Sequence, residues 1–446
     1  MQAEKTRKQA LLPGILCVIA AIVVVAVLTV GKTDAQTEGC TFPAASSLPF
    51  PQNAGQDALY NFDVKALSAA PAGYKPLFIE HYGRHGSRYA YSQYFYSDVM
   101  DALKAAEENS CLTPRGKALL EDYSRHFDHY TLHMGELCEV GWRQQQQIAR
   151  VMYRSFPDAF NAKDAYAYAC ASSSMRSVMS MAGFCTGLQS EAPGLDIYAQ
   201  QSKSTLGATL PRDKNNPFFT PRVEEPWPFE ETVDEFQSRK LDSRAIVQRL
   251  FTGEDKILKG KNLNTFVRNM YVMVIGMNSL KEEERTDFSG IFTDEELETL
   301  NEVQNYRAGH EWWPYGARSI AVVEDIIADA DERLACGKHG VKARFGHDHV
   351  ALPVLRLLGV NHYGDAPTTP DRFTEIFNVD DSPMGCNFQI VFYASKSPQK
   401  PILVKVLLNG VEGTFDTENY KGPYYRWDNL REYLKERIDR YPVKNK

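Results

Sequence analysis

Hydrophobic and polar positions predict strands and helices that alternate along most of the chain. Short apolar runs of strand length lie between longer segments in which apolar residues recur at helical spacing. The predicted strands cover about residues 75–80, 165–171, 341–345, 388–393 and 402–408. The predicted helices cover about residues 93–108, 144–154, 172–187, 320–335, 351–358 and 427–437, and another begins in the turn 113–116. We therefore expect an α/β fold in which helices flank a central mixed sheet.

One long segment, residues 210–315, departs from this alternation. It is rich in charged residues, proline and asparagine, and it has helical periodicity but few strand signals. We expect a mostly helical cap here, inserted into an α/β core that covers about residues 56–209 and 316–446. A chain of 446 residues is long enough for a large core with such an insertion.

The first 35 residues have the pattern of a targeting segment. Lys5, Arg7 and Lys8 precede an apolar stretch from Leu11 to Val30. A signal peptide and a signal anchor both fit this pattern. We expect an exported protein (periplasmic, secreted, or tethered to the outer side of a membrane through this segment alone) whose folded domain is formed by residues 36–446.

The net charge of the chain limits the classes of molecule that it can bind. The formal net charge is −7, so the overall field of the protein does not attract nucleic acid. An anionic small molecule must then bind where positive charge is local.

Export would allow disulfides, although an odd number of cysteines follows the targeting segment. These are Cys40, Cys111, Cys138, Cys170, Cys185, Cys336 and Cys386, and their spacing does not indicate a zinc site.

The turn after the first predicted strand carries the strongest chemical signal. His85 stands between Arg84 and Arg88 in a turn bounded by Gly83 and Gly86. Arginine side chains present planar sets of N–H donors that match phosphate oxygens. A neutral histidine is a nitrogen nucleophile near neutral pH. The motif therefore predicts attack on a phosphoryl group.

Two further segments supply the rest of a phosphoryl-transfer site. Arg176 lies in the first turns of the helix that follows the second strand, and we expect serines to cap that helix. His347 and Asp348 stand between the third strand and its helix. Ligands of open α/β folds bind at this carboxyl edge of the sheet. We expect Arg176 and His347 to bind phosphate, and Asp348 to protonate the leaving oxygen as a general acid.

On these motifs the chain resembles the histidine acid phosphatases, in the branch that includes phytases and multiple inositol polyphosphate phosphatases. The resemblance runs from about residue 56 to the end, with the landmarks of the family in consistent order. They are Arg84-His85-Gly86-Ser87-Arg88-Tyr89, Leu112-Thr113-Pro114-Arg115-Gly116, Gly135-Glu136-Leu137 with Gly141, Ser172 to Ser180, His347-Asp348, and Val404-Lys405-Val406-Leu407-Leu408-Asn409.

The resemblance implies a histidine phosphatase fold and a phosphomonoesterase that uses no metal or other cofactor. It implies a phosphohistidine on His85, a proton from Asp348, and inositol polyphosphates such as phytate as substrates. The implied phosphate-binding residues are Arg84, Arg88, Arg176 and His347. The inositol polyphosphate phosphatases usually have His-Ala-Glu where this chain has His347-Asp348-His349. The proton donor therefore resembles that of acid phosphatases and bacterial phytases.

Other functions are weighed against this one. A broad-specificity acid phosphatase would use the same residues, whereas a phosphate-binding surface protein without activity would be expected to lack His85 or Asp348. Phosphoglycerate mutases share the first motif, but they usually have an acidic residue at the position of Ser87 and are much shorter. The motifs of serine hydrolases (Gly-x-Ser-x-Gly) and of P-loop enzymes (Gly-x-x-x-x-Gly-Lys-Ser/Thr) are absent from the sequence.

Basic residues of the predicted cap are candidates for substrate specificity. Lys256, Lys259 and Lys261 form a basic loop that would meet additional phosphates of a polyphosphorylated ring. Lys214 and Arg212 are similar candidates. A solvent-exposed basic face is the alternative interpretation, and the sequence does not determine the oligomeric state or the position attacked first.

Overall fold

The computed structural model describes residues 54–62, 66–364 and 368–444, which belong to one compact unit. The targeting segment and Cys40 lie outside the described residues, so export stays a prediction. Within the described ranges, no helix is both long enough and apolar enough to cross a membrane. The cysteines in these ranges are all free, so the disulfides that export would allow do not form among them; they are Cys111, Cys138, Cys170, Cys185, Cys336 and Cys386.

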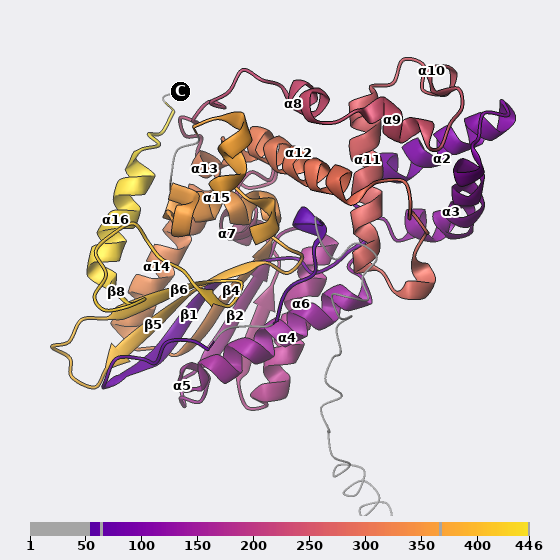
Figure 1. The fold of residues 1–446 in the computed structure, drawn as a ribbon. Coiled ribbons are helices and arrows are strands. Elements are labelled where there is room, and N and C mark those ends of the chain that lie inside the picture. Colours follow the sequence, from indigo (N-terminus) through magenta and orange to yellow (C-terminus); the bar gives the residue numbers. More distant parts are fainter. Residues whose placement is uncertain (1–53, 63–65, 365–367, 445–446) are drawn as a thin grey trace, which may run out of the picture. The chain divides into compact units, whose positions relative to one another are not determined.

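A mixed sheet of eight strands forms the centre of the unit (Figure 1). Along the sheet the strand order is β3-β2-β4-β1-β5-β6-β7, and β8 pairs with β6. The strands are β1 (Tyr74–Arg84), β2 (Tyr166–Ala171), β3 (Asp196–Gln200), β4 (Gly340–Gly346), β5 (Asn387–Ser395), β6 (Leu403–Leu408), β7 (Val411–Glu412) and β8 (Tyr425–Arg426). Strands β1 to β4 are parallel to one another, and β5 is antiparallel to both β1 and β6. The predicted mixed sheet is confirmed.

Helices account for most of the remaining structure. They are α2 (Gln93–Glu108), α3 (Pro114–Leu132), α4 (Glu139–Ser155), α5 (Pro157–Phe160), α6 (Met175–Glu191), α7 (Leu206–Thr209), α8 (Val233–Lys240), α9 (Ser243–Gln248), α10 (Glu254–Ile257), α11 (Leu263–Gly276), α12 (Asp294–Trp312), α13 (Tyr315–Arg318), α14 (Ile320–Cys336), α15 (Asp348–Leu358) and α16 (Trp427–Asp439). Each helix predicted from the sequence is present, with ends that shift by a few residues.

Local chemistry explains where several of these helices begin and end. The hydroxyl of Thr113 accepts a hydrogen bond from the Gly116 amide at the start of α3, and Pro114 occupies the first helical position. Thr293 and Glu296 form a capping box at the start of α12. Helix α15 ends at Gly359, whose φ of 66° lies in the left-handed region that glycine adopts without strain.

Helices cover both faces of the sheet because successive strand residues point to opposite sides. In β1, Phe78 and Tyr82 pack into a core with α12, α14, α15 and α16, whereas Ile79 packs with α4, α5 and α6 on the other face. Figure 1 shows α14 and α16 on one side of the sheet and α4 to α6 on the other. A third apolar cluster joins α2 and α3 to α11, away from the sheet.

Candidate active site

Three parallel strands end side by side and bring the separate motifs together. Arg84 at the end of β1 is in register with Gly346 of β4, and Ala171 at the end of β2 is in register with Phe345. The next residues along these strands are His85, His347 and Ser172. The sequence prediction that these motifs share one sheet edge is therefore confirmed. Strand β1 is longer than predicted because residues 81–84 of the motif continue its pairing with β4.

Close backbone packing holds the His85 turn in place. A Cβ atom on Gly86 would lie 2.4 Å from the carbonyl oxygen of Gly141, so only glycine fits between the turn and α4. The Gly86 amide donates to the Ser180 hydroxyl (3.0 Å), and the Ser87 amide donates to the Gln144 side chain (2.8 Å). The side chain of Gln145 donates to the Arg84 carbonyl (3.0 Å). Helices α4 and α6 thus fix the backbone around the nucleophile.

His85 is oriented for attack through Nε2. Its Nδ1 lies 2.9 Å from the carbonyl oxygen of Gly86, which can only accept a hydrogen bond, so Nδ1 carries the proton and Nε2 keeps a lone pair. The side chain is 2% exposed. Burial, followed by the charges of Arg176, Arg84 and Arg88, holds the pKa of His85 well below its usual value. The imidazole is therefore neutral in mild acid, as the motif predicted, although burial has a larger effect than the arginines.

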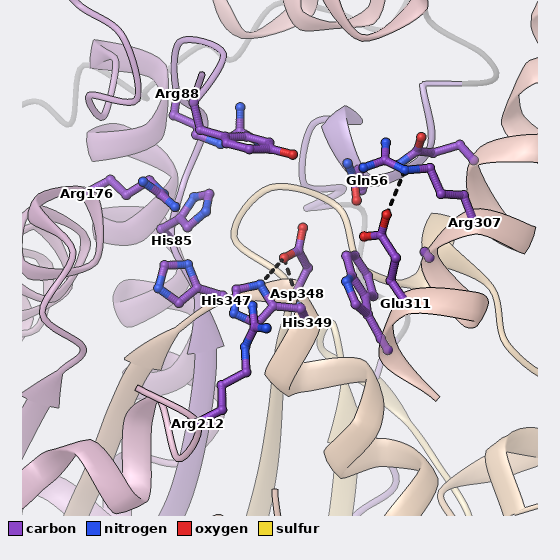
Figure 2. Close-up of a pocket in the computed structure, with 14 residues that line it drawn as sticks. Gln56, His85, Arg88, Arg176, Arg212, Arg307, Glu311, His347, Asp348 and His349 are labelled. Carbon is purple, nitrogen blue, oxygen red and sulfur yellow. Dashed lines mark hydrogen bonds and ion pairs between the residues drawn. The ribbon is translucent and has the colours of Figure 1, made fainter. Parts of the chain in front are cut away.

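Arg88 and Arg176 face the pocket beside His85 (Figure 2). Arg88 is buried, and its Nη2 lies 3.7 Å from the carboxylate of Asp57, which is itself 1% exposed. Burial and the nearby charge of Arg88 lower the pKa of Arg176 to about 10, which leaves it protonated at neutral pH. Two cations therefore flank the nucleophile where a bound phosphoryl group would carry its charge.

Arg84 lies behind the nucleophile and does not line the pocket. It is fully buried, and its Nη1 donates to the carbonyl oxygens of Gln56 and Ser382. Its Nη2 forms an ion pair with the carboxylate of Asp348 at 2.8 Å. In this arrangement Arg84 positions Asp348 and contributes positive charge from beneath the site.

Side chains from two strands fix the position of His347. Its Nε2 lies 3.1 Å from the hydroxyl of Ser172, which follows β2. Its backbone amide donates to the Tyr82 hydroxyl of β1 (3.3 Å), and this hydroxyl in turn donates to the carbonyl oxygen of Thr209 (2.9 Å). The rings of His85 and His347 are 5.5 Å apart and nearly perpendicular. Burial keeps the pKa of His347 well below its usual value, so it is a neutral hydrogen-bonding group.

The serines at the start of α6 do not cap it as predicted. Ser174 occupies the N-cap position, but its side chain makes no capping hydrogen bond. Ser172 contacts His347, and Ser173 donates to Asp213 (2.9 Å). Because β2 ends beside β4, the Ser172 hydroxyl contacts a residue of the site, and the Ser173 hydroxyl contacts the loop that contains Asp213.

Asp348 projects into the pocket from the first turn of α15. Burial alone would raise the pKa of its carboxyl group. The charge of Arg84 and the hydrogen bond from His349 outweigh burial and hold the pKa well below the usual value. Without substrate, Asp348 is therefore ionised, and it needs a change in its surroundings before it can donate a proton.

The remaining wall of the pocket is also basic. Arg212 follows α7, and Arg307 lies on α12, where its Nε donates to Glu311 at 2.9 Å. Figure 2 shows the Arg307–Glu311 pair across the pocket from Arg176. Among the described residues, four arginines and two carboxylates line the pocket, which favours an anionic ligand with charge beyond one phosphate.

The predicted cap lysines lie outside the set of residues that line this pocket. Lys214, Lys256, Lys259 and Lys261 are all exposed, and Lys261 pairs with Asp98 at 3.0 Å. A role for these lysines in specificity stays a prediction. Of the basic candidates in that part of the sequence, Arg212 is the one that reaches the pocket.

A comparison with protein families matches residues 83–409 to the histidine phosphatase superfamily (branch 2). The matched range contains the His85 turn, Arg176 and His347-Asp348. The chain belongs to this superfamily. It is therefore a phosphatase of the histidine type, and the predicted phosphohistidine chemistry now rests on family membership as well as on geometry.

Solved structures with the same fold include inositol phosphate enzymes. A multiple inositol polyphosphate phosphatase of Bifidobacterium longum, in complex with inositol hexasulfate, is 16% identical with a TM-score of 0.67. That match covers 86% of this chain and 97% of the other. The phytase of D. castellii is 13% identical with a TM-score of 0.60, and the match covers 86% of this chain and 84% of that one. No curated protein matches the sequence.

Several residues of this histidine phosphatase site were missed by the sequence analysis. Gln56 and Asp57 belong to a short 3₁₀ helix, Gly55–Asp57, that contacts Arg84 and Arg88. Nothing in their local sequence indicates this role. Gln144 and Gln145 could have been found, because they lie on the buried face of the amphipathic helix α4, where polar side chains need partners.

The described residues contain no cluster of candidate metal ligands. Within residues 54–62, 66–364 and 368–444, no group of three or more histidine, cysteine or acidic side chains is placed to hold a metal ion. His347 and His349 stack on each other with ring centroids 4.9 Å apart. The carboxylate next to His349 is that of Asp348, which is already paired with Arg84.

Proposed function

We propose that this phosphatase hydrolyses inositol polyphosphates through a phosphohistidine on Nε2 of His85. The observation that carries the proposal is the orientation of His85: its Nδ1 is fixed on the Gly86 carbonyl, and its Nε2 is left free beside Arg88 and Arg176. Asp348 lies in the same pocket as the only acid next to the nucleophile among the described lining residues.

In the first step, Nε2 of His85 attacks phosphorus as the bond to the leaving oxygen breaks. Arg88, Arg176 and His347 hydrogen-bond the equatorial oxygens and stabilise the charge of the transition state. Asp348 transfers its proton to the departing alkoxide, since an alkoxide is a poor leaving group. In the second step, water attacks phosphorus, the N–P electron pair returns to His85, and Asp348 takes a proton from the water.

Substrate binding allows Asp348 to take up from solvent the proton that it lacks in the free enzyme. A phosphate dianion beside Arg88 and Arg176, bound in front of the buried Arg84, offsets the positive charge that holds the Asp348 pKa down. The carboxyl group then protonates in mild acid. We therefore expect activity to fall as pH rises through the pKa of Asp348 in the complex.

Two features support a substrate with several phosphates. Arg212 and Arg307 lie on the pocket wall beyond the residues that surround His85, where further phosphates of a ring would meet them. The Bifidobacterium longum enzyme of the same fold binds inositol hexasulfate, an analogue of a hexakisphosphate. A broad-specificity acid phosphatase would not need this second group of arginines.

The test is phosphate release by the full chain from inositol hexakisphosphate and from p-nitrophenyl phosphate, in mild acid and with a chelator present. We expect release from both, a higher kcat/KM for the inositol ester, and loss of both in His85→Ala. Activity that survives in His85→Ala would overturn the phosphohistidine. Equal kcat/KM values for the two substrates would favour the broad-specificity alternative.

A further inference from the structure

His349 is a buried histidine in the pocket without an assigned role. It follows Asp348 on α15, and it lines the same cavity. Its Nδ1 lies 3.4 Å from Oδ1 of Asp348, and its backbone amide donates to the same oxygen at 2.8 Å. Its Nε2 is buried and has no hydrogen-bond partner among the described protein atoms. Figure 2 shows the interaction between His349 and Asp348 at the centre of the pocket.

The two oxygens of Asp348 therefore have different partners. Oδ2 pairs with Arg84 (2.8 Å), and Oδ1 faces His349. A phosphate bound in front of Arg84 offsets the positive charge of the first interaction but leaves the second interaction in place. His349 is thus the titratable side chain that contacts Oδ1 of the general acid.

The surroundings of His349 determine when it binds a proton. Its ring packs against the stacked ring of His347 and near Trp312 and Tyr315. The titratable and charged groups that face it are His347, Asp348, Arg176 of α6, Arg212 after α7, Tyr315 of α13 and Glu311 of α12. Burial lowers its pKa in the free enzyme, Asp348 raises it, and Arg212 and Arg176 lower it further. A bound dianion offsets the two arginines, so the proton enters with the substrate.

We propose that His349 is a proton-relay residue for Asp348, and that the two side chains share one transferable proton between Nδ1 and Oδ1. This inference rests on the proposed phosphohistidine reaction. Two coupled groups bind a proton as a pair, and the pair keeps it to a higher pH than an isolated carboxyl group does. His349 thus extends the working range of the general acid toward neutral pH.

The proton balance of the relay follows the two steps of the reaction. As the bond from phosphorus to the alcohol oxygen breaks, the shared proton passes from Nδ1 of His349 through Oδ1 of Asp348 to that oxygen, which leaves a neutral imidazole beside a carboxylate. When water attacks the phosphohistidine, Asp348 accepts one proton from the water, and the pair again shares this proton between Oδ1 and Nδ1. No other reactant is needed, and the pair ends with the proton it had at the start.

The experiment compares wild type with His349→Gln by the single-turnover rate of phosphate-ester cleavage, with enzyme in excess. This rate reports proton donation in the bound complex and not the later hydrolysis of the phosphoenzyme. With inositol hexakisphosphate, we expect the alkaline limb of the pH profile of His349→Gln to lie about one pH unit below that of wild type. At pH values above the limb, this shift corresponds to a rate about tenfold lower than that of wild type. With p-nitrophenyl phosphate, whose leaving group needs little protonation, the limb should stay in place.

His339→Gln is the matched control. His339 also pairs with an aspartate, since its Nδ1 lies 3.1 Å from Asp164, but it does not line the pocket. We expect its pH profile to coincide with that of wild type. His349→Thr is the second variant, and thermal unfolding establishes that each variant is folded.

The outcomes separate this inference from the proposed function. A uniform loss of rate at all pH values in the His349 variants would show a positioning effect without proton transfer and would overturn the relay. An equal shift with the aryl ester would overturn it as well. If neither variant folds, the pH profile of wild type decides. An alkaline limb for the inositol ester at a pH no higher than that of an isolated carboxyl group would overturn the relay. Wild-type protein that cleaves neither ester would contradict the proposed function itself.

Discussion

The guanidinium of Arg84 and the carboxylate of Asp348 form a buried ion pair, with 2.8 Å between Nη2 and Oδ2. One residue ends β1 and the other begins α15, and both are implied by the family resemblance as parts of the catalytic site. In the free enzyme this pair keeps the general acid ionised. The structure thus links phosphate binding to proton uptake, since an anion bound in front of Arg84 offsets the positive charge that keeps the carboxylate ionised.

This link predicts that binding of an inert dianion takes up protons. Inorganic sulfate carries no titratable proton in mild acid, so any proton change must come from the protein. We expect net uptake near pH 5, measured by titration calorimetry in buffers with different ionisation enthalpies. Asp348→Asn should take up fewer protons, and uptake unchanged in this variant would show that other groups titrate.

The leaving group should reveal the role of Asp348 directly. General acid catalysis contributes about 10²- to 10⁴-fold in typical enzymes. We expect Asp348→Asn to lose activity in this range on inositol hexakisphosphate but much less on p-nitrophenyl phosphate, because nitrophenolate leaves without protonation. The measurement is kcat for both substrates at the acid optimum of wild type. A similar loss on both would indicate that Asp348 mainly organises Arg84.

Arg307 should separate polyphosphorylated from singly phosphorylated substrates. It lines the pocket opposite Arg176, where it would meet a phosphate other than the one being cleaved. We expect Arg307→Ala to raise KM for inositol hexakisphosphate about tenfold, which corresponds to about 1.4 kcal/mol for one lost charge-assisted contact. KM for p-nitrophenyl phosphate should change little.

The matched control for Arg307 is the double variant of Lys256 and Lys259 to alanine. Both lysines are exposed cap residues that do not line the pocket. If the double variant raises KM for the inositol ester as much as Arg307→Ala does, the cap contributes to specificity as the sequence analysis predicted.

The buried histidines should make the protein less stable in acid. His81 is fully buried between Phe184 and Phe345, and neither ring nitrogen has a hydrogen-bond partner among the described atoms. Burial lowers its pKa from 6.5 to about 3. Between these pH values the unfolded state binds the proton more strongly, so the free energy of unfolding falls as pH falls. His85 and His347 act in the same direction.

The change to measure is the slope of the free energy of unfolding against pH between about 6 and 4. One such histidine contributes up to about 1.4 kcal/mol per pH unit. His81→Phe removes this proton-binding site and should flatten the slope by up to that amount, as determined by urea unfolding at several pH values. An unchanged slope would mean that His81 is not the group that titrates.

The sequence by itself determined the elements and the chemistry of the motifs. The helix α2, Gln93–Glu108, and the strands β5 and β6 were predicted because periodicity and turn residues are local signals. His85, Arg176 and His347 were predicted to share one site because the carboxyl ends of neighbouring parallel strands lie at the same edge of a sheet. That expectation needed only the order of the strands and helices.

Only the tertiary structure decided which groups touch. The contact of Asp57 with Arg88, the ion pair of Arg84 with Asp348, and the arrival of Arg307 at the pocket all join segments that are distant along the chain. Periodicity reports which face of an element is buried, but it carries no information on which partner a buried polar group finds. Those pairings follow from how the helices pack on the sheet, and they determine the protonation states on which the reaction depends.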